Sequence, residues 1–106
     1  MEYNEYRVII TAPAKADLME IDEYISNELN APLAARNFVL TVHNAIKTLT
    51  FSPQGLPKVQ DDRLSAKGYR WIGIKNYMAF YTIDEQSRIV NVERILYGRR
   101  DWRRLL

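Results

Sequence analysis

Two apolar stripes of helical period, set close together, constrain the fold of this chain more than any other feature. The first stripe follows Pro13, which suits the first turn of a helix, and contains Ala14, Leu18, Ile21, Ile25 and Leu29. The second follows Pro32 and contains Ala35, Phe38, Val39, Val42, Ala45, Ile46 and Leu49. Because only the tripeptide Asn-Ala-Pro at 30–32 separates the stripes, we predict two amphipathic helices that form an antiparallel hairpin.

Strand patterns lie on both sides of the predicted hairpin. Within residues 5–12, Tyr6, Val8 and Ile10 alternate with the side chains between them, as in a strand. An irregular polar stretch follows the second helix as far as about residue 67, and further strands are predicted at 69–75, 77–83 and 89–97. Residues 99–106 can form a short C-terminal helix. The order β-αα-β-β-β-α predicts one α+β domain over residues 1–106, with the helical hairpin packed on one face of a mostly antiparallel four-stranded sheet.

The two faces of this predicted sheet differ in chemistry. We assume that residue 74 pairs with 77 and residue 83 with 89, and side chains then alternate between faces. One face carries Trp71, Met78, Phe80, Val90, Val92 and Leu96, with Lys75 and Arg94 near its edges. The other carries Arg70, Tyr77, Tyr81, Asn91, Glu93 and Tyr97, mixed with Ile72, Ile74, Ala79 and Ile83. We expect the helices to cover the first face and the second to be open, as a recognition surface or simply as a solvated polar face. A one-residue slip in register would exchange the faces.

Positive charge is concentrated in the second part of the chain. Residues 1–62 carry five Lys/Arg and nine Asp/Glu, whereas residues 63–106 carry ten and four, so −4 and +6 give the net charge of +2. The last residues contain Arg99, Arg100, Arg103 and Arg104, which we interpret either as an anion-binding cluster or as solvated charge. Trp102, Leu105 and Leu106 are expected to dock on the core. The split favours a basic surface that meets a nucleic acid or an acidic protein, unless the charges interleave in space.

Several kinds of site are disfavoured by composition. The chain has no cysteine and a single histidine, His43, so no metal site and no cofactor are predicted. No apolar run reaches the roughly 18 residues of a membrane span, and a cytoplasmic location is expected. Tyr3, Tyr6 and Tyr24 are interpreted as packing residues, and His43 as a solvated one. Cleavage of a phosphodiester could use Arg70, Glu93 and Tyr97, but a tyrosine phenol, with a reference pKa near 10, is a poor base at neutral pH.

The segments "YRVIITAPAKADLMEIDEYI", "FSPQG" and "GYRWIGIKNYMAFYTID…VNVERILYGRRDW" resemble, in order, the RelE/ParE superfamily of toxins from type II toxin–antitoxin (plasmid-stabilisation) modules. The resemblance covers essentially the whole chain and implies the same β-αα-β-β-β-α fold. It also implies a cognate antitoxin that wraps the toxin in a hetero-oligomeric complex, and growth inhibition by the free toxin.

The target that the resemblance implies depends on the branch. The ribonuclease branch, which cleaves mRNA on the ribosome without a metal, commonly has arginine where Tyr77 stands and a tyrosine or histidine near Leu106. These departures favour the ParE branch, which poisons DNA gyrase, although histidine is common there in place of Tyr97. The candidate target- or anion-binding residues are Arg70, Tyr77, Tyr81, Arg94, Tyr97, Arg99 and Arg100. For the alternative, an mRNA endoribonuclease, the candidates are Arg70, Glu93, Tyr97 and Arg100. A non-toxic member that only binds its antitoxin is the third possibility.

Overall fold

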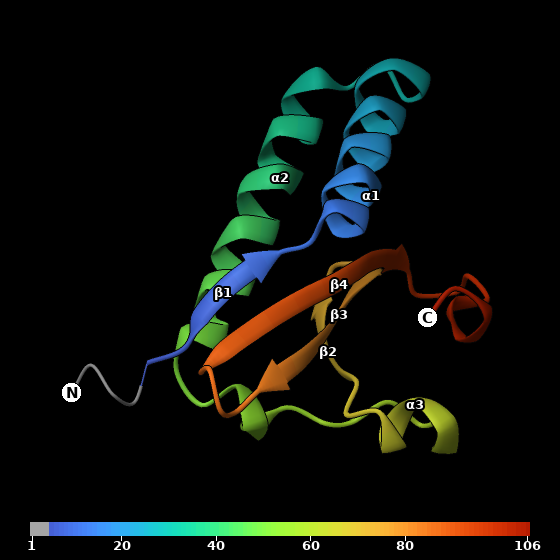
Figure 1. The fold of residues 1–106 in the computed structure, drawn as a ribbon. Coiled ribbons are helices and arrows are strands. Elements are labelled where there is room, and N and C mark those ends of the chain that lie inside the picture. The colour runs from blue at the N-terminus through green and yellow to red at the C-terminus, as the bar shows by residue number, and fades with distance from the viewer. Residues whose placement is uncertain (1–4) are drawn as a thin grey trace.

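The computed structural model describes residues 5–106, so Tyr3 lies outside the described part of the chain. The elements are β1 (Arg7–Ile10), α1 (Ala12–Glu23), α2 (Pro32–Lys47), α3 (Asp62–Ala66), β2 (Arg70–Ile74), β3 (Tyr77–Asp84), β4 (Ile89–Tyr97) and a 3₁₀ turn (Trp102–Arg104). The α1–α2 hairpin lies on one side of the sheet, and α3 and the C-terminal turn lie on the other (Figure 1). The predicted α+β class and element order are therefore confirmed, with α3 added and the terminal helix reduced to one turn.

The helical hairpin begins and turns where the sequence indicates. The Thr11 hydroxyl accepts the Ala14 N–H at 3.4 Å and donates to the Val92 carbonyl at 2.9 Å, which caps α1 and ties its start to β4. After α1 the helix widens into a π-helical turn, Tyr24–Glu28. A π turn takes up more residues than an α turn and rotates the end of the stripe. Leu29, which we placed on the buried stripe, is consequently 55 % exposed.

The sheet has the order β1-β4-β3-β2 and is mixed rather than purely antiparallel. β1 runs parallel to β4, with Val8 opposite Val90, whereas β4–β3 and β3–β2 are antiparallel. Parallel strands need a long crossover connection, and the helical hairpin with β2 and β3 provides one between β1 and β4. The β2–β3 register is as predicted, with Ile74 opposite Tyr77.

The β3–β4 register differs from our assumption. Ile83 pairs with Val90 instead of residue 89, and the pairing shifts again between Phe80 and Tyr81, where Glu93 is the extra residue of a β-bulge. This one-residue slip moves Val90 and Val92 to the hairpin side. A bulge of this kind has no signature in the alternation of side chains, so the sequence could not reveal it.

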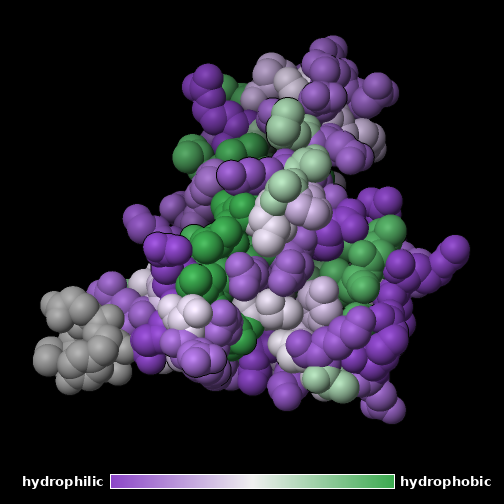
Figure 2. All heavy atoms as spheres, viewed as in Figure 1, coloured by the Kyte–Doolittle hydropathy of each residue, from purple (hydrophilic) through white to green (hydrophobic). Residues whose placement is uncertain are grey.

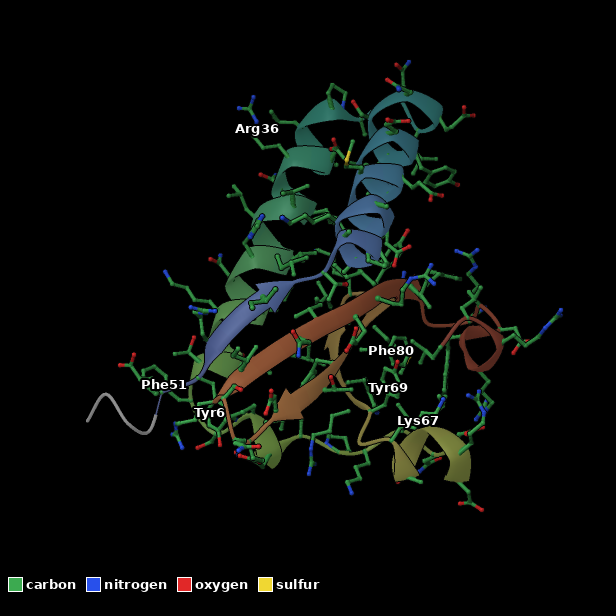
Figure 3. All side chains as sticks on the ribbon, in the orientation of Figure 1. Tyr6, Arg36, Phe51, Lys67, Tyr69 and Phe80 are labelled. Carbon is green, nitrogen blue, oxygen red and sulfur yellow. The ribbon has the colours of Figure 1, made fainter. Side chains whose placement is uncertain are left out.

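The assignment of the faces was wrong as a result. The helices cover the face that we expected to be open, and their core partners from the sheet are Ile74, Ala79, Tyr81, Val90, Val92 and Ile95. The opposite face, with Phe80 and Leu96, is covered by Val59, Leu64 and the docked tail residues Trp102, Leu105 and Leu106. Figure 3 shows Phe80 and Tyr69 between the sheet and α3. The chain thus supplies an apolar cover for each face, and the docking predicted for the tail is confirmed.

α3 was missed because residues 61–67 read only as polar linker. The Asp61 carboxylate caps this helix by accepting the Leu64 N–H at 3.0 Å, and Leu64 is fully buried. Arg63 donates to the Arg103 carbonyl at 2.8 Å, so α3 and the C-terminal turn are fastened to one another. A single buried leucine between charged residues gives no periodic signal, which is why the helix was not foreseen.

Candidate functional site

The C-terminal tail leaves the sheet at a tight crossing. Tyr77 and Tyr97 are opposite each other at the ends of β3 and β4, and the Gly98 N–H donates to the Asn76 carbonyl at 2.8 Å. A Cβ on Gly98 would lie 3.2 Å from that carbonyl oxygen, which accounts for glycine here. The Arg100 N–H then donates to the Tyr97 carbonyl at 3.0 Å. Tyr97 and Arg100 line one depression, and the exposed Arg99 lies between them in sequence; we call these three residues the tip.

Aromatic rings gather behind the tip. The Tyr77 ring lies between Phe38, at 5.0 Å, and Tyr97, at 5.6 Å in an edge-to-face arrangement. Burial, reinforced by the nearby Tyr24 and Tyr97, raises the pKa of the Tyr77 phenol, so it remains a neutral hydrogen-bonding group. Tyr97 is 41 % and Tyr24 is 51 % exposed. Tyr24 was expected to pack inside, but it lies on the π turn and faces solvent.

A depression of about 190 Å³ lies beside these rings. It is lined by Asp17, Glu20, Ile21, Tyr24, Tyr77, Ile95, Leu96, Tyr97 and Arg100. The tyrosines offer flat faces with hydroxyl groups at their edges, and Arg100 lies at the rim. Such a combination suits a partner that presents both apolar and anionic groups. Three of the predicted contact residues, Tyr77, Tyr97 and Arg100, thus come together at this site.

The arginines of the tail fall into two sets within residues 5–106. Arg103 approaches Asp61 at 3.5 Å, and Arg104 approaches Asp101 at 3.9 Å. In the described part of the chain, no ion pair or side-chain hydrogen bond involves Arg99 or Arg100, and both are exposed. Their guanidinium groups are consequently available for carboxylate or phosphate oxygens.

Arg70 and Tyr81 lie away from the tip, on the hairpin side of the sheet. Arg70 donates to the Leu56 carbonyl at 2.6 Å, and the buried Tyr81 hydroxyl donates to the Pro53 carbonyl at 2.6 Å. Burial raises the pKa of Tyr81 to about 12. Both groups hold the segment after α2 against the sheet. Tyr81 pairs with Arg70, four residues along β3 from Tyr77, a separation of about 13 Å. The open recognition surface that we expected to carry Arg70 and Tyr81 together with Tyr77 and Tyr97 is therefore not formed.

Glu93 and Arg94 also have structural partners. The Glu93 carboxylate accepts the Thr82 hydroxyl at 2.9 Å. Arg94 donates to both oxygens of Asp17, at 2.7 and 2.9 Å, and more weakly to the Leu105 carbonyl at 3.3 Å. The Asp17 carboxylate raises the pKa of Arg94, which stays fully charged. Through Asp17 and Leu105, Arg94 joins α1, β4 and the tail.

The charge split does not produce one basic face. Cations of the second part are paired in space with acids of the first, as in Arg94 with Asp17 and Arg103 with Asp61. The interleaved arrangement, which we kept as the alternative, is therefore the closer description of the fold. Arg99 and Arg100 are among the exposed cations that have no ion pair within the described residues, as are Lys58, Lys67 and Lys75.

An apolar groove that the sequence reasoning missed lies between β1 and the helices. It has a volume of about 390 Å³ and is lined by Ile10, Lys15, Leu18, Met19, Asp22, Val39 and His43. Figure 2 shows hydrophobic surface over β1 and the neighbouring part of the hairpin. Met19 is 64 % and the nearby Leu40 is 54 % exposed. Both lie beside the main helical stripes, and that position was the available signal for a second apolar surface.

Two further observations limit the kinds of site. No cluster of three or more potential metal-ligating side chains exists among residues 5–106. The described helices are all too short or too polar to cross a membrane.

Comparison with solved structures shows which known proteins share this fold. A solved structure of the chromosomal ParDE toxin–antitoxin system from P. aeruginosa has a chain with a TM-score of 0.73 and 19 % identity, covering 89 % of this chain and 97 % of its own. The toxin–antitoxin complex RelBE2 from Mycobacterium tuberculosis gives a TM-score of 0.60 and 19 % identity, with 88 % and 98 % covered. No curated protein sequence matches significantly. At this identity, the two structures establish the shared fold.

The family assignment comes from the sequence itself. A family model described as "ParE toxin of type II toxin-antitoxin system, parDE" matches residues 8–102, which is nearly the whole chain. The chain therefore belongs to the ParE toxin family, within the RelE/ParE superfamily that its motifs resemble, and is a type II toxin–antitoxin toxin.

Proposed function

We propose that this toxin, when free, arrests growth by poisoning DNA gyrase, and that the tip makes the contact with its target. The observation that carries the proposal is the family match over residues 8–102, together with two exposed arginines beside Tyr97 that have no ion pair among residues 5–106. Guanidinium groups next to exposed phenols suit a protein or protein–DNA surface that offers carboxylates or phosphates.

The contacts of the candidate catalytic residues support gyrase over mRNA cleavage. Cleavage through a 2′-hydroxyl needs a base, a cation and an acid around one phosphate. The Glu93 carboxylate is hydrogen-bonded to Thr82, and Arg70, at the end of β2 that is farther from the tip, is hydrogen-bonded to the Leu56 carbonyl. Only Tyr97 and Arg100 of that candidate set share the tip. Leu106, which stands where the ribonuclease branch has a proton-transfer residue, packs against the core.

The target is tested with the purified chain and gyrase. We expect inhibition of supercoiling and accumulation of cleaved DNA. The double variant Arg99→Ala/Arg100→Ala should lose both effects, whereas Arg104→Ala, which removes a paired arginine from the same tail, should retain them. Normal supercoiling at a large excess of wild-type toxin would refute the gyrase proposal. Codon-phased cuts in mRNA from induced cells would instead indicate the ribonuclease, and harmless expression a non-toxic member.

We further propose that the cognate antitoxin docks an amphipathic segment in the groove between β1 and the helices. Both similar solved structures contain toxin–antitoxin complexes. The groove is apolar along its floor and is lined by Lys15, His43 and a single acid, Asp22; Arg36 of α2 lines an adjoining depression that shares Asp22 and Val39 with the groove. Arg36 points outward from α2 (Figure 3). This arrangement fits a segment with apolar anchors and acidic flanks, the composition typical of a partner that folds on binding.

The groove is tested by co-expression with the protein encoded by the adjoining gene. Met19→Asp places a charge on the apolar wall and should abolish copurification and rescue of growth, while toxicity persists. Leu33→Asp is the matched control, because Leu33 is 71 % exposed and does not line the groove. Unchanged rescue of Met19→Asp would place the antitoxin elsewhere.

A further inference from the structure

A second pocket lies on the face of the sheet opposite the helices, and it contains both tryptophans of the chain. Its volume is about 300 Å³ and its lining consists of Pro57, Lys58, Val59, Gln60, Trp71, Met78, Trp102 and Arg103. We call it the indole pocket. It lies between the segment that precedes α3 and the docked C-terminal turn, and its lining includes none of the residues that define the tip or line the groove.

The two indoles have different surroundings. The Trp102 ring packs on Phe80 at 5.2 Å, and the Arg103 guanidinium lies over it at 4.4 Å, so its faces are used within the protein. Trp71 lies along the edge strand β2, and its ring comes within 3.5 Å of where a Cβ on Gly73 would be. Gly73 is exposed and has no side chain to cover that ring. Trp71 and Trp102 therefore both line the pocket, and the Trp71 ring is only partly buried.

Exposed cations stand at the rim of this surface. The Lys58 side chain has no ion pair among the described residues and is exposed. Arg103 is held in place by Gln60, whose carbonyl accepts at 3.2 Å, and by Asp61, yet its side chain is still 52 % exposed. A flat aromatic floor flanked by cations is complementary to a base that carries phosphates on either side.

From this juxtaposition we propose that the indole pocket binds an unpaired nucleobase of a single-stranded nucleic acid. The base stacks on Trp71, and the flanking phosphates contact Lys58 and Arg103. An acidic peptide would also satisfy the cations, but the two indoles that line one pocket favour a planar, aromatic guest. The proposal concerns a site separate from the tip and does not depend on which target the toxin has.

The position of the tryptophans provides a site-specific readout. Trp71 and Trp102 are the only tryptophans in the chain, and in a Trp102→Phe background all tryptophan emission comes from Trp71. A titration with the hexanucleotide dT6 should quench this emission to saturation. An abasic hexamer of equal charge should bind at least about tenfold more weakly, because it lacks the stacking contribution. The ribonucleotide rU6, run in parallel, shows whether the sugar is read.

Charge variants test the rim without disturbing the fold. Lys58→Ala should weaken dT6 binding and reduce the slope of log K against log salt by about 0.7, the value for one phosphate contact on a single strand. Lys47→Ala, which removes an exposed lysine from α2, should leave affinity and slope unchanged. Trp71→Ala, checked for folding by circular dichroism, should abolish the preference for dT6 over the abasic hexamer. Because this variant lacks the Trp71 emission, its binding is measured by the fluorescence anisotropy of a labelled oligonucleotide.

Two results would overturn the proposal. Equal affinity for dT6 and the abasic hexamer would show that only backbone charge is bound. A higher affinity for an acidic peptide of the same charge, measured by the quenching of Trp71 emission, would assign the pocket to a protein partner. Supercoiling inhibition, measured on the same Lys58→Ala sample, reports on the tip alone, so failure at one site is distinguishable from failure at the other.

Discussion

Removing Arg94 should destabilise the fold far more than removing any arginine of the tail. Asp17 is only 6 % exposed and receives hydrogen bonds from Arg94 at 2.7 and 2.9 Å and from the Ile95 N–H at 2.9 Å. In Arg94→Met the carboxylate keeps one donor and loses its counter-charge inside the protein. Loss of one partner from a buried pair costs about 3–5 kcal/mol. Because the Arg94 side chain is 23 % exposed and water can approach, we expect about 3 kcal/mol.

A double-mutant cycle separates the pair from its surroundings. Asp17→Asn keeps an acceptor for the Ile95 N–H and removes the charge, and we expect it to cost about 1–2 kcal/mol. The double variant Asp17→Asn/Arg94→Met has no unpaired charge, so it should be more stable than the sum of the single effects predicts, by about 1–3 kcal/mol. The control Arg104→Met removes an exposed arginine 3.9 Å from Asp101 and should change stability by less than about 0.5 kcal/mol.

The measurement is urea unfolding followed by far-UV circular dichroism, with an unchanged slope in denaturant as the check that the unfolded states are comparable. Strictly additive effects of Asp17→Asn and Arg94→Met would refute the coupling. A cost for Arg94→Met as small as that of Arg104→Met would refute the reasoning that Asp17 is a buried charge held by this arginine.

Three other changes have defined outcomes. Tyr6→Phe removes a hydroxyl that donates to the Glu85 carboxylate at 2.6 Å. The hydrogen bonds from Tyr6 and then from Gln54 lower the pKa of Glu85 below 4.5. These bonds therefore stabilise the fold above pH 4.5, and their contribution is lost as the pH falls through the lowered pKa of Glu85. The stability gap between wild type and Tyr6→Phe should therefore narrow in acid unfolding series below about pH 4.5, and a constant gap would contradict this. Tyr81→Phe, which frees the Pro53 carbonyl, should cost about 1–2 kcal/mol in urea unfolding with gyrase inhibition retained. Gly98→Ala should lower the melting temperature and weaken inhibition together, because its Cβ presses on Asn76 and displaces the tip.

Local periodicity in the sequence was sufficient to predict most of the fold. The stripes of α1 and α2, the prolines before them and the turn at Asn76 determine elements through neighbours in sequence, and these predictions are confirmed. The choice of covered face depended instead on the β3–β4 register, which the bulge at Glu93 sets. Tyr81 shows the consequence. Its hydroxyl was expected to be available for recognition, but it is buried and donates to a carbonyl 28 positions away in sequence. No local pattern encodes such a long-range partner.

The candidate site was predictable in part for the same reason. Tyr97, Arg99 and Arg100 follow one another along the chain, so their proximity is a local property. Arg70 was grouped with them through its assumed place on the open face, and Arg94 through its place near the edge of the other face, but each has a partner brought by tertiary structure. Composition gives the number of arginines, but only packing decides which of them remain free.

The arrangement of α1 links the two surfaces proposed for partners. Asp17, Glu20, Ile21 and Tyr24 line the depression at the tip, whereas Lys15, Leu18, Met19 and Asp22 line the groove. Each set has the spacing of one helical stripe, and an offset of two residues places the stripes on nearly opposite sides of the helix. A connection between the two sides must run around the helix, and half the circumference of a helix about 10–12 Å across is about 16–19 Å, which about five or six extended residues can span. An antitoxin segment docked in the groove could therefore cross α1 with a short connection and reach Tyr97 and Arg100, so neutralisation by covering the tip requires no displacement of the docked tail.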